Sequence, residues 1–136
     1  MRTAAIQKVI GFLIMGSSLI MLPPVLVSLY YDDGTYRVFL DSAGIFLVMG
    51  LLIYLPVKGE RRDLHLRDGF LVVTCSWLAV ILVGALPYVL LTSPNLSFLD
   101  AMFESASGFT TTGATIISNV DVLPRSILFY RMETQW

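Results

Sequence analysis

Charged side chains are scarce in this sequence. They make up 14% of the 136 residues, whereas a soluble domain carries about 25%. This shortage argues against a soluble globular enzyme and against a disordered tail, because both present a polar surface to water. The net charge of −1 at pH 7 leaves no basic footprint, so we do not expect the chain to bind nucleic acid.

Cysteine and histidine are nearly absent as well. Cys75 has no partner for an internal disulfide and lacks the neighbours of a zinc or redox motif. His65 has no second metal ligand nearby, and we interpret it as part of a solvated charged segment. Asp32, Asp33 and Asp41 would be the candidates for a metal cluster, but without a histidine they are better explained as acidic residues at a membrane interface. We therefore expect no enzyme, no resident metal and no cofactor.

Apolar residues are abundant, at 56%, and they gather in long uncharged stretches. Val9–Tyr31 and Gly69–Leu99 contain no charged residue. Ser42–Val57 is a shorter stretch, which Val38–Leu40 extends if Asp41 lies at the interface. A helix needs about 20 mostly apolar residues to cross a bilayer. Three such stretches leave too little polar chain to cover them in water, so we predict three transmembrane helices in a lipid bilayer.

The first stretch differs from a secretory signal peptide, whose apolar region is about 7–15 residues long and ends at small residues. It is longer, contains Pro23-Pro24, and ends at Tyr30 and Tyr31. We predict a retained helix with a kink at the proline pair, because membrane helices tolerate proline where neighbours satisfy the freed carbonyls. The two tyrosines fit an interfacial position.

The distribution of basic residues predicts the orientation. The N-terminus carries Lys8, the second loop, Lys58–Asp68, is rich in basic residues, and the segment Gly69–Leu123 has no Lys or Arg. The remaining basic residues of these two regions are Arg2, Arg61, Arg62 and Arg67. By the positive-inside rule the N-terminus and the second loop lie in the cytoplasm. The first loop, Asp32–Asp41, and the chain after Leu91 then lie outside.

A short helix is predicted at Phe98–Phe109, beyond the break of the third span. Ser97, followed by Asp100 three residues later, resembles a capping box with Asp in place of Glu or Gln. Asp100 and Glu104 lie near the positive end of the helix dipole, where negative charge is favoured. Such a helix is about 18 Å long at 1.5 Å per residue, which is too short to cross a membrane.

The segment Thr110–Thr115 follows this helix and should end it. Threonine is a poor residue for a helix interior, and Gly113, as a glycine, can adopt backbone angles closed to other residues. Extended backbone at membrane depth is costly unless it lines water or is buried in protein. A short helix followed by a Thr/Gly strand is the arrangement of an ion selectivity filter, in which backbone carbonyls replace the hydration shell of a cation.

The sequence DAMFESASGFTTTGAT, Asp100–Thr115, resembles the first pore loop of the TrkH/TrkG group of bacterial potassium-uptake proteins, which are related to KtrB. Arg67–Leu71 resembles the start of the preceding helix in that family, and Leu123–Arg131 with Gln135-Trp136 resembles the next helix. In the N-terminal half, Met21–Pro24 and Asp33-Gly34 resemble the two extra helices that precede the family's pore repeats.

The resemblance implies a specific site. Carried over by position, Thr111 and Thr112 would offer potassium-coordinating oxygens, with Thr110 and Gly113 flanking them and Gly113 as the filter glycine. Potassium would be the transported substrate. Asp100 and Glu104 would support the pore helix, and we interpret Glu104 as a structural anchor rather than a proton relay.

The resemblance also implies an assembly. Family members contain four helix–pore loop–helix repeats in one polypeptide, and each repeat supplies one quarter of the filter. They form homodimers in the bacterial inner membrane and work with a cytosolic nucleotide-binding regulatory subunit. The chain ends near the start of the second helix of the first repeat, because Ser126–Trp136 is too short to span. The remaining repeats of a full-length transporter are therefore expected partners.

We thus predict an all-α membrane protein. It would have three transmembrane helices, a re-entrant pore helix with an extended filter strand, and the start of a further helix. Residues 1–60 would form two N-terminal transmembrane helices, and residues 61–136 a first repeat truncated in its second helix. A segment of a potassium transporter is the favoured function. The alternatives are a pore assembled from four copies and a non-conducting accessory protein that packs against a full-length transporter.

Overall fold

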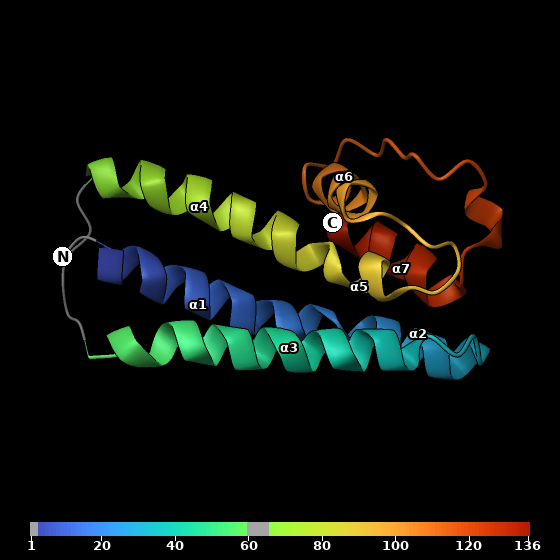
Figure 1. Cartoon of the computed structure of the whole chain (residues 1–136), viewed down its shortest axis with the longest axis horizontal. Coiled ribbons are helices and arrows are strands. Elements are labelled where there is room, and N and C mark those ends of the chain that lie inside the picture. The colour runs from blue at the N-terminus through green and yellow to red at the C-terminus, as the bar shows by residue number, and fades with distance from the viewer. Residues whose placement is uncertain (1–2, 60–65) are drawn as a thin grey trace.

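The computed structural model of the protein describes residues 3–59 and 66–136, and within these residues every regular element is a helix (Figure 1). The elements are α1 (Thr3–Ile20), α2 (Leu22–Tyr31), α3 (Tyr36–Tyr54), η1 (Leu55–Val57), α4 (Leu66–Gly84), α5 (Leu86–Leu90), α6 (Phe98–Phe109), η2 (Val120–Val122) and α7 (Arg125–Thr134). The predicted all-α class is confirmed. Arg2, Arg61, Arg62, His65 and the expected boundary between residues 60 and 61 lie outside the described residues.

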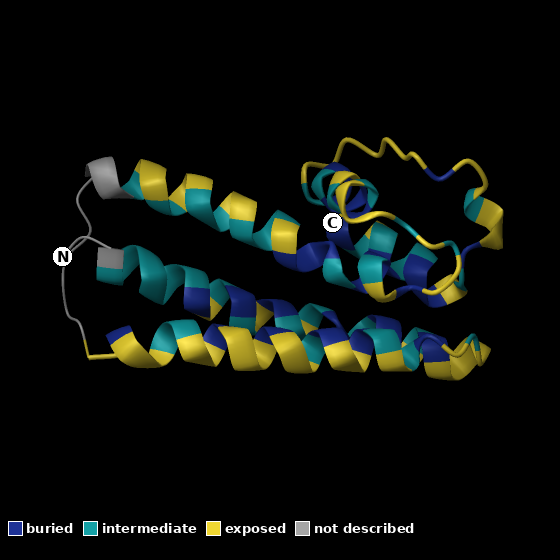
Figure 2. Ribbon diagram, viewed as in Figure 1, coloured by how far each residue is buried: buried dark blue, intermediate teal, exposed yellow. Residues whose placement is uncertain are grey.

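Three helical segments are long and apolar enough to cross a membrane, as predicted. They are Ala4–Tyr31, Tyr36–Val57 and Gly69–Leu90. The third ends at Leu90, well before the end of the uncharged stretch at Leu99, because the chain leaves the helix after α5. Many large apolar side chains of these segments are exposed, including Phe12 at 66% and Leu52 at 67%. In Figure 2 the exposed residues line the outer faces of the long helices, where lipid would cover them.

The three long segments run along a common direction, and α6 is seen nearly end-on beside α5 and α7 (Figure 1). The start of α1, the end of α3 and the start of α4 share one end of the bundle, where Lys8 Nζ donates a hydrogen bond to the Lys58 carbonyl at 3.5 Å. The α2–α3 loop, α5, η2 and the start of α7 gather toward the opposite end. The described residues that flank the second loop therefore lie at the same end of the bundle as the start of α1. Which side is cytoplasmic stays a prediction.

Prolines break two of the three segments. α1 ends at Ile20 and α2 begins at Leu22, so the helix is interrupted at Met21. Pro23-Pro24, where a kink is predicted, lie in the first turn of α2. The second break separates α4 from α5, where Pro87 has no N–H to donate. The Gly84 carbonyl at this break accepts a hydrogen bond of 3.0 Å from the buried hydroxyl of Tyr130 on α7. A neighbouring helix thus satisfies a carbonyl at the break, as membrane helices require.

The core lies where these breaks meet α7. Its largest fully buried side chains include the aromatic rings of Phe39, Phe46, Tyr88 and Tyr130. The Tyr130 ring lies 5.7 Å from that of Phe39 and 5.5 Å from that of Tyr88, between centroids. Such aromatic pairs add about 0.5–1.5 kcal/mol beyond the area they bury. They join α3, α5 and α7 beside α6.

Gly84 should be required for the approach of α6 to α4. A Cβ atom at this position would lie 2.4 Å from Phe109 Cε2 and 2.6 Å from Ser105 Oγ. Gly84→Ala should therefore destabilise the protein by about 1–3 kcal/mol through overpacking. Gly44→Ala, on α3 with no atom within 4 Å of its Cβ position, should be neutral or stabilising. Thermal unfolding in detergent measures the stability of both variants. Equal melting temperatures for Gly84→Ala and Gly44→Ala would contradict the close packing of α6 against α4.

Candidate functional site: the α6 helix and the Thr110–Thr115 ribbon

Helix α6 has the predicted bounds, Phe98–Phe109. Ser97 has extended backbone angles, and its Oγ accepts a hydrogen bond of 3.2 Å from the Asp100 N–H. This is the predicted N-cap. Among the described residues no bond runs back from the Ser97 N–H to the Asp100 carboxylate, so the capping box is only half formed. The helix is stabilised at its start by Ser97 rather than by a reciprocal pair.

Serines attach α6 to its surroundings. Ser105 Oγ donates to the Ile81 carbonyl on α4 at 2.8 Å, and Ser107 Oγ donates to the Ala114 carbonyl at 2.6 Å. On its other side, Gly108 lets Thr134 of α7 come close, because a Cβ there would lie 2.4 Å from Thr134 Oγ1. The helix is therefore held between α4, α7 and the segment that follows it.

The helix ends at Phe109, as predicted, and closes with a Schellman motif. The Thr111 N–H donates to the Gly108 carbonyl at 2.8 Å, and the Thr112 N–H donates to the Ser107 carbonyl at 2.9 Å. Thr111 occupies the left-handed position of this motif with φ of 56°. Glycine is the usual residue there. A β-branched residue with positive φ is strained, and such strain concentrates at functional positions.

The following segment is irregular rather than a regular extended strand. Thr111 and Gly113 both have positive φ, at 56° and 74°. The expectation of an extended strand is wrong in this detail, because the N–H groups after α6 turn back to the last carbonyls of the helix. We call residues Thr110–Thr115 the ribbon. Gly113 is the one ribbon residue with positive φ that takes this conformation without a Cβ penalty.

The ribbon presents unpaired carbonyl groups. Its residues are exposed, and in Figure 2 the ribbon runs along the side of α6 that faces away from α1 and α3. Within the described residues no hydrogen bond reaches the carbonyl oxygens of Thr111, Thr112 or Gly113. The hydroxyls of Thr110 and Thr112 are engaged with each other at 2.8 Å. The backbone oxygens of Thr111, Thr112 and Gly113 are therefore available as ligands, and hard cations prefer oxygen.

Glu104 anchors the far end of the ribbon. Its side chain is buried, with 2% of the residue exposed. Oε1 accepts hydrogen bonds from the Ile116 N–H at 2.9 Å and from Thr115 Oγ1 at 2.5 Å. Oε2 accepts from Nη1 of Arg131 on α7 in a salt bridge. One carboxylate thus connects α6, the ribbon and α7.

The two acidic residues predicted to support the helix differ in what they contact. Glu104 reaches the ribbon, whereas Asp100 is half-buried, and among the described residues its carboxylate makes no ion pair. Sequence reasoning missed the role of Arg131, which appears there only at the end of a segment that resembles the family's next helix. A signal was present, since a buried carboxylate needs a cation. Gly69–Leu123 contains none, which leaves Arg125 and Arg131 as the nearest candidates toward the C-terminus.

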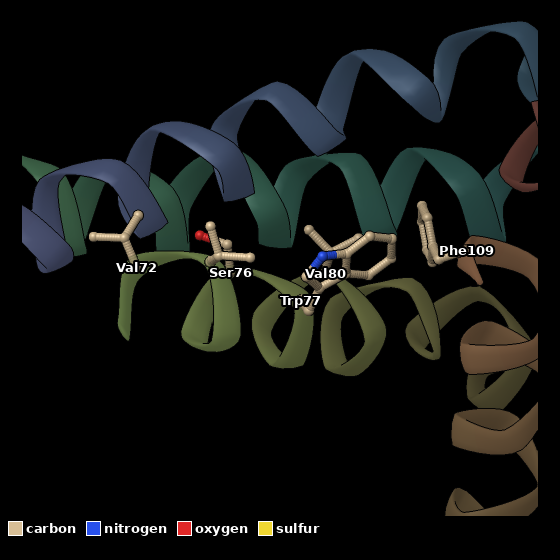
Figure 3. A pocket seen from close by; sticks show the side chains of 6 residues that line it. Val72, Ser76, Trp77, Val80 and Phe109 are labelled. Carbon is tan, nitrogen blue, oxygen red and sulfur yellow. The ribbon is translucent and has the colours of Figure 1, made fainter. Parts of the chain in front are cut away.

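An apolar groove lies on α4 next to the end of α6 (Figure 3). It is lined by Val72, Val73, Ser76, Trp77, Val80 and Phe109. The buried Ser76 hydroxyl has no hydrogen-bond partner among the described residues. This lining offers almost no polar atoms, so the groove lacks the oxygen ligands of an ion site. The ribbon is the part of this region with cation-binding chemistry.

Removing the charge of Glu104 should strongly destabilise the protein. Glu104→Gln leaves Arg131 partly buried without its counter-ion, and breaking a buried pair costs about 3–5 kcal/mol. The double variant Glu104→Gln/Arg131→Met should recover part of this loss, because no unpaired charge remains. Asp100→Asn is the matched control and should change the melting temperature little. If the effects of Glu104→Gln and Arg131→Met on the melting temperature are additive, the two side chains do not interact as described.

Comparison with known proteins identifies the family of this chain. Residues 36–136 match the TrkH family, described as cation transport protein. Over 131 residues, 96% of the chain, the sequence is 46% identical to the Trk system potassium uptake protein TrkH of Halomonas elongata. Over 136 residues, the whole chain, it is 43% identical to the protein of the same name from Escherichia coli K12.

The fold also matches that of a solved structure. The crystal structure of the potassium transporter TrkH from Vibrio parahaemolyticus matches with a TM-score of 0.88 and 41% identity, over 96% of this chain and 28% of that chain. The chain spans 27% and 28% of the length of the two curated relatives. These relatives are membrane transporters and not enzymes, and this chain corresponds to their N-terminal portion. The chain belongs to the TrkH family of cation transport proteins.

Proposed function

We propose that the chain is a segment of an inner-membrane potassium-uptake transporter and contributes one quarter of its carbonyl-lined selectivity filter. The observation that supports this most is the ribbon, a non-helical segment with free carbonyl groups held beside a helix too short to cross a bilayer. The relatives are named as potassium uptake proteins. Residues 61–136 would then be the first helix–pore loop–helix repeat, and residues 1–60 a preceding pair of helices.

Potassium would bind to backbone oxygens of Thr111, Thr112 and Gly113, with Thr110 flanking them. These carbonyls have no donor among the described residues, so a dehydrated cation would replace solvent rather than break a hydrogen bond. The C-terminal end of α6 adjoins the ribbon, and its partial negative charge favours a cation there. Selectivity would depend on how firmly the ribbon is held, because the coordinating oxygens must keep their spacing.

The rest of the transporter would complete the site. One ribbon cannot surround an ion, so three further repeats belong to the proposal. The family resemblance adds a homodimer and a cytosolic nucleotide-binding regulatory subunit. The N-terminus and the loop at residues 58–68 would lie in the cytoplasm, and the α2–α3 loop and η2 would lie outside. The pore helix would enter from the outer side and return through the ribbon.

The experiment that tests this function uses a chimera, in which residues 1–136 replace the matching segment of Vibrio parahaemolyticus TrkH. The chimera should restore growth at low potassium to a strain that lacks its own uptake systems. Gly113→Ala should weaken discrimination between potassium and sodium, because alanine with positive φ costs about 1–2 kcal/mol and shifts the carbonyls. Gly16→Ala, with open space at its Cβ position, is the control.

A chimera that accumulates in the membrane but fails to support growth would contradict the proposal. So would a Gly113→Ala variant that transports with unchanged selectivity. Co-purification of the 136-residue chain with an intact transporter, without any contribution to uptake, would favour the accessory alternative instead.

Thr111→Gly separates stability from function. Glycine relieves the strain of the left-handed Schellman position and should raise the stability of the chimera by roughly 0.5–1 kcal/mol. The same change should lower potassium selectivity, because glycine lets the ribbon backbone move. Thr92→Gly, at an exposed threonine outside the helices, should do neither. Melting temperatures and potassium-to-sodium flux ratios measure both effects, and an unchanged flux ratio would contradict a role for Thr111.

A further inference from the structure

The carboxylate of Asp33 caps a helix that lies far away in the sequence. Asp33 lies in the loop between α2 and α3, and its Oδ2 accepts hydrogen bonds from the Ser126 N–H at 2.9 Å and from Ser126 Oγ at 2.7 Å. Ser126 is in the first turn of α7. The residue before that turn, Pro124, provides no side-chain cap. Asp33 therefore satisfies an N-terminal N–H of α7 and places negative charge at the positive end of its dipole.

Asp33 is itself held firmly. Its Oδ1 accepts from the Thr35 N–H at 3.1 Å, from Thr35 Oγ1 at 2.8 Å, and from the hydroxyl of Ser28. Partial burial raises the pKa of Asp33, but the hydrogen bonds from Ser28, Ser126 and Thr35 outweigh it and lower the pKa to about 2. The group is thus ionised at any physiological pH. Thr35 also contacts the Ser126 hydroxyl, and both residues are buried.

Helix α7 connects this cap to the ribbon. Ser126 and Arg131 are five residues apart, which is about 7.5 Å along the helix at 1.5 Å per residue. Arg131 pairs with Glu104, whose other oxygen holds Thr115 and the Ile116 N–H. Between them, the buried Tyr130 donates to the Gly84 carbonyl. A shift of α7 along its axis would therefore move the partner of Glu104.

We propose that Asp33 is a positioning residue for the filter, which fixes α7 and through Arg131 and Glu104 sets the position of the ribbon. This inference rests on the proposed function, because it assigns a distant residue to the selectivity of that same site. It also gives the N-terminal helices a role, since they carry the group that holds α7 in place.

Asp33→Asn in the chimera should lower the ratio of potassium to sodium flux by about 2- to 30-fold. The asparagine keeps the shape of the side chain but loses the charge and one acceptor facing Ser126. Asp32→Asn is the matched control, because Asp32 is the exposed neighbouring residue and the charge change is the same. Ser126→Thr keeps the hydroxyl and should retain the ratio, whereas Ser126→Ala should lower it. The double variant Asp33→Asn/Ser126→Ala should lower the flux ratio by less than the two single effects combined.

Flux ratios are measured on protein purified as a monodisperse peak, which separates this role from a loss of folded protein. If Asp33→Asn does not accumulate, Ser126→Ala, which removes one hydrogen bond, takes its place. A flux ratio for the tested variant equal to that of Asp32→Asn overturns the inference. If Gly113→Ala leaves the ratio of the otherwise unchanged chimera unaltered, the proposed filter fails first and the inference fails with it.

Discussion

Burial of the Glu104 carboxylate is the constraint on which the rest of the site depends. A carboxylate with so little exposure is stable only when its charge is paired and its oxygens accept hydrogen bonds. Arg131 supplies the charge, and Thr115 with the Ile116 N–H supplies the remaining donors. These partners come from α7 and from the chain after α6. Satisfying one buried group therefore brings three segments together and fixes the end of the ribbon.

The ribbon combines a favourable helix end with an unfavourable residue. The Schellman bonds after Phe109 use the N–H groups of Thr111 and Thr112, and among the described residues no hydrogen bond reaches the carbonyls of these two residues. Local preference would place glycine where Thr111 lies. Conflict between local preference and observed backbone is expected at functional sites, where strain is retained for a purpose. No such conflict exists at Gly113, because glycine adopts a positive φ readily.

Much of this structure could be predicted from the sequence, because its signals are local. Long uncharged stretches predict the three spans, and Ser97 with the following apolar residues predicts the start of α6. The Thr/Gly run predicts its end. Contacts between distant segments could not be predicted in this way. In the sequence, Arg131 looks like an ordinary charge in a helix and Asp33 like an ordinary charge in a loop. Only the fold shows that Arg131 pairs with Glu104 and that Asp33 caps α7. The left-handed Thr111 was also missed, since threonine rarely adopts that conformation.

The most direct test of the central claim is to locate a potassium analogue at the ribbon. Crystals of the chimera grown in rubidium would give an anomalous signal from the bound ion. The account predicts a peak within coordination distance of the carbonyl oxygens of Thr111, Thr112 and Gly113, with the ribbon in its irregular conformation. An ion bound elsewhere in the transporter, with these carbonyls hydrogen-bonded to protein or continuing a helix, would contradict it.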